Sequence, residues 1–236
     1  RKVARGSDQG NILKNKIAVI TGGAQGFGAG IAGAMFGLEV NVAVADINEE
    51  AGNKLIAELN SDVKTNKAIF VKTDVSDPVS VKNLVERVVI EFGGLDIMIS
   101  NAGVLRAGGL DEMAPDEFTK TTNINYNGYF YCAKYASEVM RIQNSEKPEY
   151  FADIIQINSK SGLRGSNRNF AYAGAKLGGI GLTQSFALEL APFRIKVNSI
   201  CPGNFYEGPL WSDPKNGLFV QYLNTGKVPG ARSVED

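Results

Sequence analysis

The sequence of 236 residues contains no histidine. Without an imidazole, the chain cannot build a Ser-His-Asp or Cys-His nucleophile system, or a histidine-ligated zinc, copper or non-haem iron site. Its two cysteines, Cys132 and Cys201, are far apart in the sequence and cannot by themselves form a zinc or iron–sulfur site. We therefore predict no metal site. A proton-transfer catalyst built from this chain must use tyrosine, lysine, a carboxylate or cysteine.

The sequence also lacks an excess of charge, because 25 Lys and Arg balance 25 Asp and Glu. It therefore lacks the basic surface that nonspecific nucleic-acid binding needs, and the charge bias of a protein that binds anionic membranes. No apolar run approaches membrane-spanning length, and the polar stretch 1–15 has no signal-peptide core. A pair of free cysteines fits a reducing compartment. We expect a cytoplasmic protein without nucleic-acid or membrane partners.

Short β-branched runs alternate along the chain with longer stretches of helical periodicity. The runs predict strands at 17–21, 40–45, 68–71, 95–99, 153–157 and 195–199. Helices are predicted from about 26, at 48–60, from 78, at about 115–143 and at 170–190. This alternation predicts an α/β protein with one doubly wound Rossmann domain, a parallel sheet with helices on both faces. The domain is expected to span 16–236 after a polar extension at 1–15, with loops and room for a short helix past Pro202.

A glycine-rich turn connects the first predicted strand to the first predicted helix. It has the spacing T-G-x-x-x-G-x-G, from Thr21 to Gly28. Glycines permit positive φ and close approach of the backbone to a ligand, and a helix N-terminus favours a pyrophosphate. A tight turn without a ligand would also use glycines. The candidate cofactor-binding residues in this loop are Gly22, Gln25, Gly26, Phe27 and Gly28.

A single carboxylate, Asp46, ends the second predicted strand about 20 residues beyond the loop. A carboxylate at this position can accept hydrogen bonds from the adenosine ribose hydroxyls and repels a 2′-phosphate. No Arg or Lys lies near Gln25 or directly after Asp46. Taken alone, Asp46 could be an ordinary strand-end or helix-cap residue. Together with the glycines, it predicts NAD rather than NADP.

Because histidine is absent, the strongest candidate for an acid–base residue is Tyr172, four residues before Lys176. Residues with this spacing share one face of a helix, and a nearby ammonium can lower a phenol pKa by about 1–3 units. A surface Tyr–Lys pair is the alternative. Ser159 follows the fifth strand, where open α/β sheets bind ligands. Other strand-end candidates for the cofactor cleft are Asp74, Val75, Asn101, Ala102 and Gly103.

Taken in order from about Lys16 to Gly203, these motifs resemble those of the NAD-preferring short-chain dehydrogenases/reductases. The resemblance implies that Tyr172 is the acid–base residue and that Lys176 stabilises its phenolate and binds the nicotinamide ribose. It implies that Ser159 orients the substrate oxygen. It also adds Asn125, which would hold a water linking Lys176 to solvent. The remaining cofactor residues that it implies are Pro202 and Gly203.

The segments 154–162 and 178–185 are similar to those of sorbitol-6-phosphate 2-dehydrogenases. This likeness implies hydride transfer between NAD(H) and a sugar-alcohol phosphate, of the sorbitol 6-phosphate to fructose 6-phosphate type. A dehydrogenase for a free polyol or another secondary alcohol is the alternative, and a non-catalytic NAD(H) sensor is an alternative of another class. Lys160, Arg164 and Arg168 precede the Tyr172 helix and are candidates for binding the phosphate. Equally, they could be ordinary basic residues of a solvated loop.

Members of the family continue into another helix and a final strand, so we expect the last strand and part of an oligomer interface to be missing from this chain. The Tyr172 helix contains four glycines, each costing up to about 1 kcal/mol relative to alanine. These are Gly174, Gly178, Gly179 and Gly181. They favour close approach of another backbone, and we predict a homotetramer formed through this helix. The alternative is that the glycines fit the helix against its own sheet.

Overall fold

The computed structural model describes residues 12–62, 65–204, 209–215 and 217–234. Six parallel strands form one sheet with the order β3-β2-β1-β4-β5-β6. The strands are β1 (Ile17–Thr21), β2 (Asn41–Asp46), β3 (Ala68–Lys72), β4 (Ile97–Ser100), β5 (Ala152–Ile157) and β6 (Ile195–Ile200). The predicted α/β fold is confirmed, and each predicted strand is present with ends shifted by two residues or fewer. Residues 1–11 of the predicted extension lie outside the described residues.

The helices connect these strands and begin where local sequence signals place them. They are α1 (Gly26–Gly37), α2 (Glu49–Leu59), α3 (Pro78–Phe92), α4 (Pro115–Thr122), α5 (Gly128–Glu146) and α6 (Phe170–Leu190). The Asn48 side chain caps α2 by accepting from the Ala51 N–H at 3.1 Å. Asp77 caps α3 by accepting from the Val79 N–H at 2.9 Å, with Pro78 at the first helical position.

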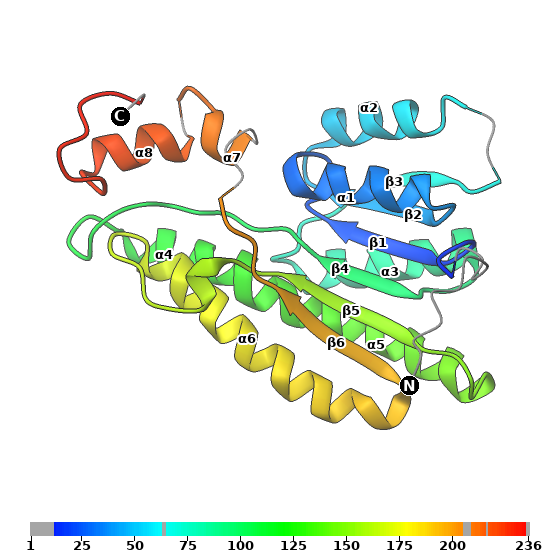
Figure 1. Cartoon of the computed structure of the whole chain (residues 1–236). Coiled ribbons are helices and arrows are strands. Elements are labelled where there is room, and N and C mark those ends of the chain that lie inside the picture. The colour runs from blue at the N-terminus through cyan, green and yellow to red at the C-terminus, as the bar shows by residue number, and fades with distance from the viewer. Residues whose placement is uncertain (1–11, 63–64, 205–208, 216, 235–236) are drawn as a thin grey trace, which may run out of the picture.

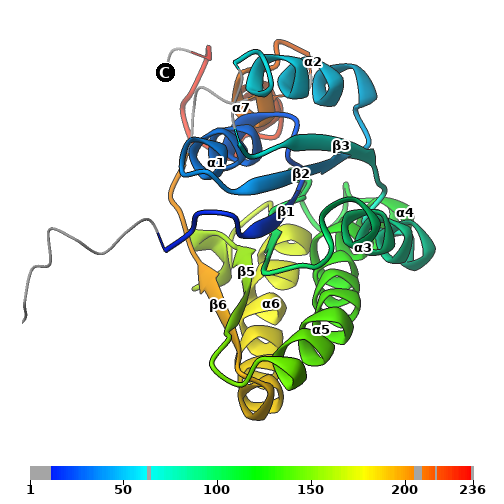
Figure 2. The ribbon, with the colours of Figure 1, turned by 90° about the vertical axis from the view of Figure 1, so that its right-hand side faces the viewer.

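Two apolar clusters cover the two faces of the sheet. Side chains alternate along a strand, so in β1 Val19 belongs to one cluster while Ala18 and Ile20 belong to the other. The Val19 cluster packs under α3, α5 and α6, and the opposite cluster packs under α1 and α2. Figure 2 shows these helices on either side of the strands. This three-layer arrangement confirms the doubly wound architecture.

The predicted helical region at 115–143 differs from the structure in one respect. A π-helical turn, η1 (Asn123–Asn127), separates α4 from α5, and α5 continues to Glu146. Such turns add a residue to the helical repeat and are common at functional sites. Asn125 lies in the centre of η1 and is buried. Helical periodicity alone does not predict this turn.

The strand order reverses between β1 and β4, which are hydrogen-bonded neighbours although β2 and β3 lie between them in the sequence. In open α/β sheets, ligands bind beyond the carboxyl ends of the strands at this reversal. Two short helices, α7 (Pro209–Ser212) and α8 (Leu218–Asn224), lie beyond those ends (Figure 1). The region after Pro202 was predicted as loops with a short helix, and its described residues contain both α7 and α8. No helix within the described ranges is long and apolar enough to cross a membrane.

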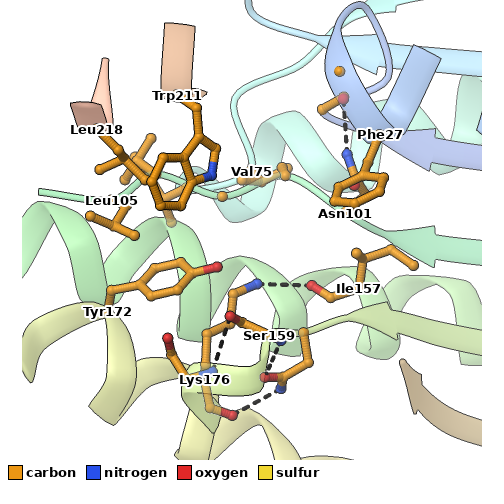
Figure 3. A pocket seen from close by; sticks show the side chains of 18 of the residues that line it. Phe27, Val75, Asn101, Leu105, Ile157, Ser159, Tyr172, Lys176, Trp211 and Leu218 are labelled. Carbon is orange, nitrogen blue, oxygen red and sulfur yellow. Dashed lines mark hydrogen bonds between the residues drawn. The ribbon is translucent and has the colours of Figure 1, made fainter. Parts of the chain in front are cut away.

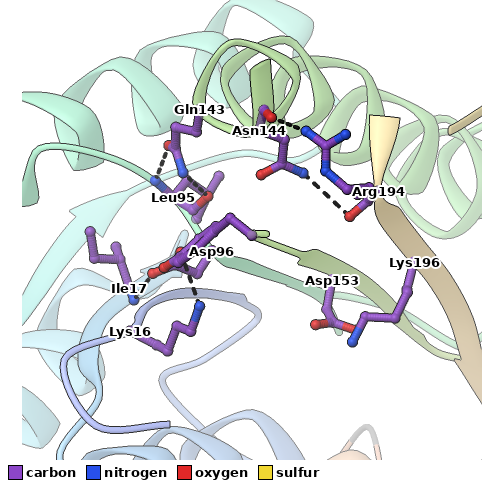
Figure 4. Close-up of polar contacts among 10 residues, drawn as sticks. Lys16, Ile17, Leu95, Asp96, Gln143, Asn144, Asp153, Arg194 and Lys196 are labelled. Atoms are coloured by element: carbon purple, nitrogen blue, oxygen red, sulfur yellow. Dashed lines mark hydrogen bonds and ion pairs between the residues drawn. The ribbon is translucent and has the colours of Figure 1, made fainter. Parts of the chain in front are cut away.

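Polar side chains connect the amino ends of the strands (Figure 4). Gln143 on α5 bonds both backbone groups of Leu95, accepting from its N–H at 2.7 Å and donating to its carbonyl at 3.0 Å. Asp96 accepts from the Ile17 N–H at 2.7 Å. Asn144 donates to the Arg194 carbonyl at 3.3 Å, and the Arg194 guanidinium donates back to the Asn144 carbonyl. These bonds tie the starts of β4 and β6 to α5, and the start of β1 to Asp96 directly before β4, at the amino ends of the strands.

Candidate active site

A cleft of about 1290 Å³ opens at the carboxyl ends of the strands. Most of the residues predicted from the sequence line this one cleft. From the cofactor set these are Gly22, Gln25, Gly26, Phe27, Asp46, Asp74, Val75, Asn101, Ala102, Gly103, Pro202 and Gly203. From the catalytic and substrate sets they are Ser159, Lys160, Arg164, Tyr172 and Lys176. Gly28, Asn125 and Arg168 do not line it.

The glycine loop between β1 and α1 adopts the shape that its sequence predicts. Gly22 and Gly26 have φ values of +60° and +53°, which favour glycine. A Cβ on Gly22 would lie 2.7 Å from Ala102 Cα, and one on Gly28 would lie 2.0 Å from the Gly22 carbonyl oxygen. Gly28 therefore packs the loop against α1 and does not face the cleft. The first turn of α1 has no side-chain cap from Gln25 and no acidic residue, an arrangement that fits a pyrophosphate.

Asp46 and Asn101 hold this loop from the two neighbouring strands. The Asp46 carboxylate accepts from the Ala24 N–H at 3.1 Å and the Asn48 N–H at 2.9 Å, so it lies beside the loop at the rim of the cleft. The Asn101 amide donates to the Gly22 carbonyl at 2.9 Å (Figure 3). A carboxylate and a glycine turn in this relation fit an adenosine ribose and its diphosphate.

The predicted Tyr–Lys pair lies on the cleft side of α6. Lys176 is 3% exposed, and its Nζ donates to the Ile157 carbonyl at 2.8 Å (Figure 3). The same Nζ lies 5.5 Å from the centroid of the Tyr172 ring. Burial lowers the pKa of Lys176 to about 8. The ammonium is thus held within the cleft wall beside the phenol.

The expected lowering of the Tyr172 pKa is not seen. Burial raises the pKa of Tyr172, and a hydrogen bond with Ser159 lowers it by a smaller amount. The physical reason is desolvation, which disfavours a phenolate more than the nearby groups of the chain favour it. Tyr172 is therefore a neutral phenol at neutral pH, ready to donate its proton.

Ser159 follows β5 in an extended conformation and caps the 3₁₀ turn η2 (Lys160–Gly162) by accepting from the Ser161 N–H at 3.1 Å. Behind it, sequence reasoning missed the buried Asn158. The Asn158 amide donates to the Lys176 carbonyl at 2.9 Å, and its oxygen accepts from the Ser159 N–H at 2.7 Å. Asn158 therefore fixes the end of β5 relative to α6. Its only sequence signal is its place directly before the candidate serine.

One of the three cations predicted for the substrate end of the cleft does not line it. Lys160 and Arg164 line the cleft as expected, whereas Arg168 pairs with Glu112 and lies outside the lining. Two residues that the sequence did not single out, Trp211 and Lys227, line the cleft from the C-terminal region. Figure 3 shows Trp211 with Leu105 and Leu218 across the cleft from Ser159 and Lys176. Neither residue follows a predicted strand, so no pattern marked them.

Comparison with known proteins agrees with this geometry. A family described as short chain dehydrogenase matches residues 16–213. The chain is a short-chain dehydrogenase. This family membership confirms the resemblance inferred from the motifs, and it makes the protein an oxidoreductase.

Individual relatives of this short-chain dehydrogenase carry different names. The trans-4-hydroxycyclohexanecarboxylate dehydrogenase of Sinomonas cyclohexanicum is 34% identical, over 94% of this chain and 82% of its own. The crystal structure of sorbitol-6-phosphate 2-dehydrogenase from Erwinia amylovora is 37% identical, with a TM-score of 0.80, over 88% of this chain and 77% of that one. A 3-ketoacyl-(acyl-carrier-protein) reductase from Brucella melitensis, solved with NADH, is 26% identical, with a TM-score of 0.78, over 84% and 78%.

Proposed function

We propose that this short-chain dehydrogenase transfers hydride between NAD(H) and the secondary alcohol or ketone of a sugar-alcohol phosphate in the cytoplasm. The observation that carries the proposal is the meeting of Ser159, Tyr172 and Lys176 in the same cleft as the glycine loop and Asp46. A non-catalytic NAD(H) sensor would have no need of the buried tyrosine and lysine. The likeness to sorbitol-6-phosphate 2-dehydrogenase supports the substrate class.

The residues of the cleft divide the chemistry between them. The nicotinamide, when bound, supplies or accepts the hydride. In reduction, the neutral Tyr172 hydroxyl donates its proton to the substrate oxygen, and in oxidation it takes the proton back. Ser159 orients that oxygen by hydrogen bonding. Lys176, through its charge, stabilises the phenolate when it forms and binds the nicotinamide ribose.

Asn125 supports the proposed proton path although it does not line the cleft. Its amide donates to the Val104 carbonyl at 2.7 Å and the Thr121 carbonyl at 2.9 Å. Its Oδ1 is buried and accepts no hydrogen bond from the described residues. A Cβ on Gly103 would lie 2.7 Å from this oxygen and 3.7 Å from Lys176 Nζ, so both atoms border one small space. That arrangement supports a water held between Asn125 and Lys176.

NAD is expected to be preferred over NADP, because the Asp46 carboxylate at the rim repels a 2′-phosphate. The measurement is kcat/KM for both cofactors. Asp46→Ala should narrow the preference by at least about tenfold, the effect of removing roughly one charge-assisted interaction. Asp74→Ala, at the adenine end of the same cleft, is the matched control and should leave the preference unchanged. Comparable efficiency of the wild type with both cofactors would contradict the assignment.

The substrate class is tested by the rate of NADH formation from sorbitol 6-phosphate and from sorbitol. Lys160→Ala or Arg164→Ala should raise KM for the phosphate ester about tenfold to a hundredfold, because each removes a charge-assisted hydrogen bond. Arg168→Ala serves as the control, since its guanidinium is already paired with Glu112. If the wild type prefers sorbitol, the substrate is not a sugar-alcohol phosphate.

A second candidate substrate is an unphosphorylated secondary alcohol with a ring. It is favoured by the apolar side chains of Trp211, Leu105 and Leu218, which border the cleft near Tyr172 (Figure 3). The relative named for trans-4-hydroxycyclohexanecarboxylate supports including such alcohols. In the same assay, faster turnover of cyclic alcohols than of sorbitol 6-phosphate would select this candidate.

Self-association into a tetramer is expected, and the helix glycines support it in part. A Cβ on Gly178 would lie 2.8 Å from the Tyr126 ring, and one on Gly179 would lie 2.4 Å from the Gln156 amide, so these two fit α6 within its own chain. Gly174 and Gly181 instead face open space. On the outer sides of α5 and α6, the exposed apolar residues are Phe130, Ile142, Leu177 and Leu188.

Light scattering at micromolar concentration should therefore report a mass near four times 25.3 kDa. Replacing the exposed Leu177 with glutamate places a charge on the proposed interface and should release smaller species. Ile90→Glu on α3, a residue that is more exposed than Leu177 but lies on another helix, should not release smaller species. A wild-type monomer would contradict the interface.

A further inference from the structure

The segment after α8 places a lysine, Lys227, in the substrate end of the cleft. Its Nζ donates to the Ser166 hydroxyl at 3.1 Å and to the Asn167 carbonyl, both in the loop that leads into α6. Lys227 and Ser166 line the same cleft as Tyr172. Two distant parts of the chain, the loop before α6 and the segment after α8, thus meet at this ammonium.

The Lys227 charge has no carboxylate partner among the residues that the structure describes. Its two hydrogen-bond acceptors are neutral, and an ammonium has three N–H donors. The nearby Arg168 is itself paired with Glu112. Burial and the charge of Arg168 lower the pKa of Lys227, so the site disfavours a cation that has no anion beside it. An incoming anion would relieve this cost.

We propose that Lys227 binds the anionic group of the substrate, in the place that the sequence suggested for Arg168. Lys227 joins Lys160 and Arg164 among the cationic side chains of the cleft lining in which Tyr172 lies, a lining that also includes the carboxylates Asp116 and Asp213. The inference rests on the proposed function, because it takes this end of the cleft as the substrate site. It also goes beyond that function, since it assigns substrate recognition to the segment after α8.

The placement of α8 supports this role. The Gln221 side chain on α8 accepts from the Ala107 N–H at 2.9 Å, in the loop after β4. Lys227 makes the corresponding contact with the loop before α6. The segment is therefore attached on both sides of the cleft, and an anion on Lys227 would add a third contact. Binding of the anion should draw the segment toward the cleft.

Trp211 provides a direct readout, because it is the single tryptophan of the chain and lines the cleft. Its emission is measured in the enzyme saturated with NADH, with which sorbitol 6-phosphate does not react. The ligands are sorbitol 6-phosphate, sorbitol, inorganic phosphate and trans-4-hydroxycyclohexanecarboxylate. Phosphate tests the anion site alone, and the last ligand distinguishes a carboxylate from a phosphate ester.

The informative variants are Lys227→Gln, which keeps a donor for Ser166 without the charge, and Lys227→Arg, which keeps the charge. Lys227→Gln should raise Kd for phosphate and sorbitol 6-phosphate about tenfold to a hundredfold. Lys227→Arg should keep most of the wild-type affinity for both anions. The Kd of sorbitol, which carries no anion, is the internal reference. Lys215→Ala, an exposed lysine of the same region outside the cleft lining, is the matched control.

The inference would be overturned by a wild type that binds no phosphate or other ligand anion, or by a Lys227→Gln variant that binds each anion as the wild type does. Equal weakening of sorbitol and sorbitol 6-phosphate would also overturn it, because it would assign Lys227 a purely structural contact. Lys227-dependent anion binding without turnover of sorbitol 6-phosphate supports the anion site and refutes the proposed substrate. The anion site at Lys227 and the sugar-alcohol phosphate substrate can therefore be refuted independently.

Discussion

Tyr172→Phe is expected to lower kcat by about 10²–10⁴-fold, the usual contribution of a positioned acid or base. In the proposed mechanism, the Tyr172 hydroxyl exchanges a proton with the substrate oxygen. The substitution removes a single oxygen atom and leaves the ring on α6. NADH binding, followed by fluorescence, should therefore survive.

The control for Tyr172→Phe is Tyr150→Phe. It removes a hydroxyl that donates to Asp96 at 2.5 Å, directly before β4 and thus at the end of the sheet opposite the cleft. This variant should keep the wild-type kcat even if its stability falls. Near-normal turnover by Tyr172→Phe would show that another group is the acid–base residue. Because burial raises the pKa of Tyr172, ketone reduction should persist at neutral pH, while alcohol oxidation accelerates as the pH rises.

Lys176→Met is expected to abolish turnover, weaken NADH binding and raise the thermal stability. The ammonium is 3% exposed, and burial lowers its pKa from 10.5 to about 8. At neutral pH this burial costs on the order of 3 kcal/mol of folding free energy, since each pKa unit corresponds to about 1.4 kcal/mol. Methionine fills a similar volume without the charge. The buried ammonium at this site thus serves activity and lowers the free energy of unfolding.

The pH dependence gives this prediction a second test. Below pH 8, Lys176 is protonated in the folded and unfolded chains, so burial of the charged ammonium destabilises the fold by its full amount. Between pH 8 and 10.5 the folded chain releases the proton first, and wild-type stability rises relative to the variant. The difference in Tm should therefore be largest below pH 8 and shrink toward pH 10.5. A Lys176→Met protein that melts below the wild type at pH 7 would refute the assigned cost.

The features that could be predicted are those determined by residues close together in the sequence. The glycine loop, Asp46 and the limits of α6 follow from short-range spacing, because backbone conformation there depends on neighbouring residues. The cleft position of Ser159 follows from the rule that parallel strands end together. Placing these residues needed only the ends of the strands and the helical register, both of which the sequence pattern indicates.

The remaining features depend on contacts between distant segments. Lys227 meets Ser166 across 61 residues, and the Asn158 amide meets the Lys176 carbonyl across 18. The π turn at Asn125 interrupts a helix without any glycine or proline to signal it before Gly128. The raised pKa of Tyr172 follows from burial, which exists only in the folded chain. Sequence spacing carries no information on such pairings.

The bonds of Gln143, Asp96 and Arg194 at the amino ends of the strands imply an uneven resistance to local opening. Amide hydrogens around Leu95 and Ile17 are held by side chains from other elements, so they should exchange with solvent only on global unfolding. The short helices α7 and α8 beside the cleft contribute no described residue to the two apolar clusters, so they can open separately. Ligands would then enter and leave through small fluctuations at one end of the sheet, while the opposite end preserves the fold throughout each catalytic cycle.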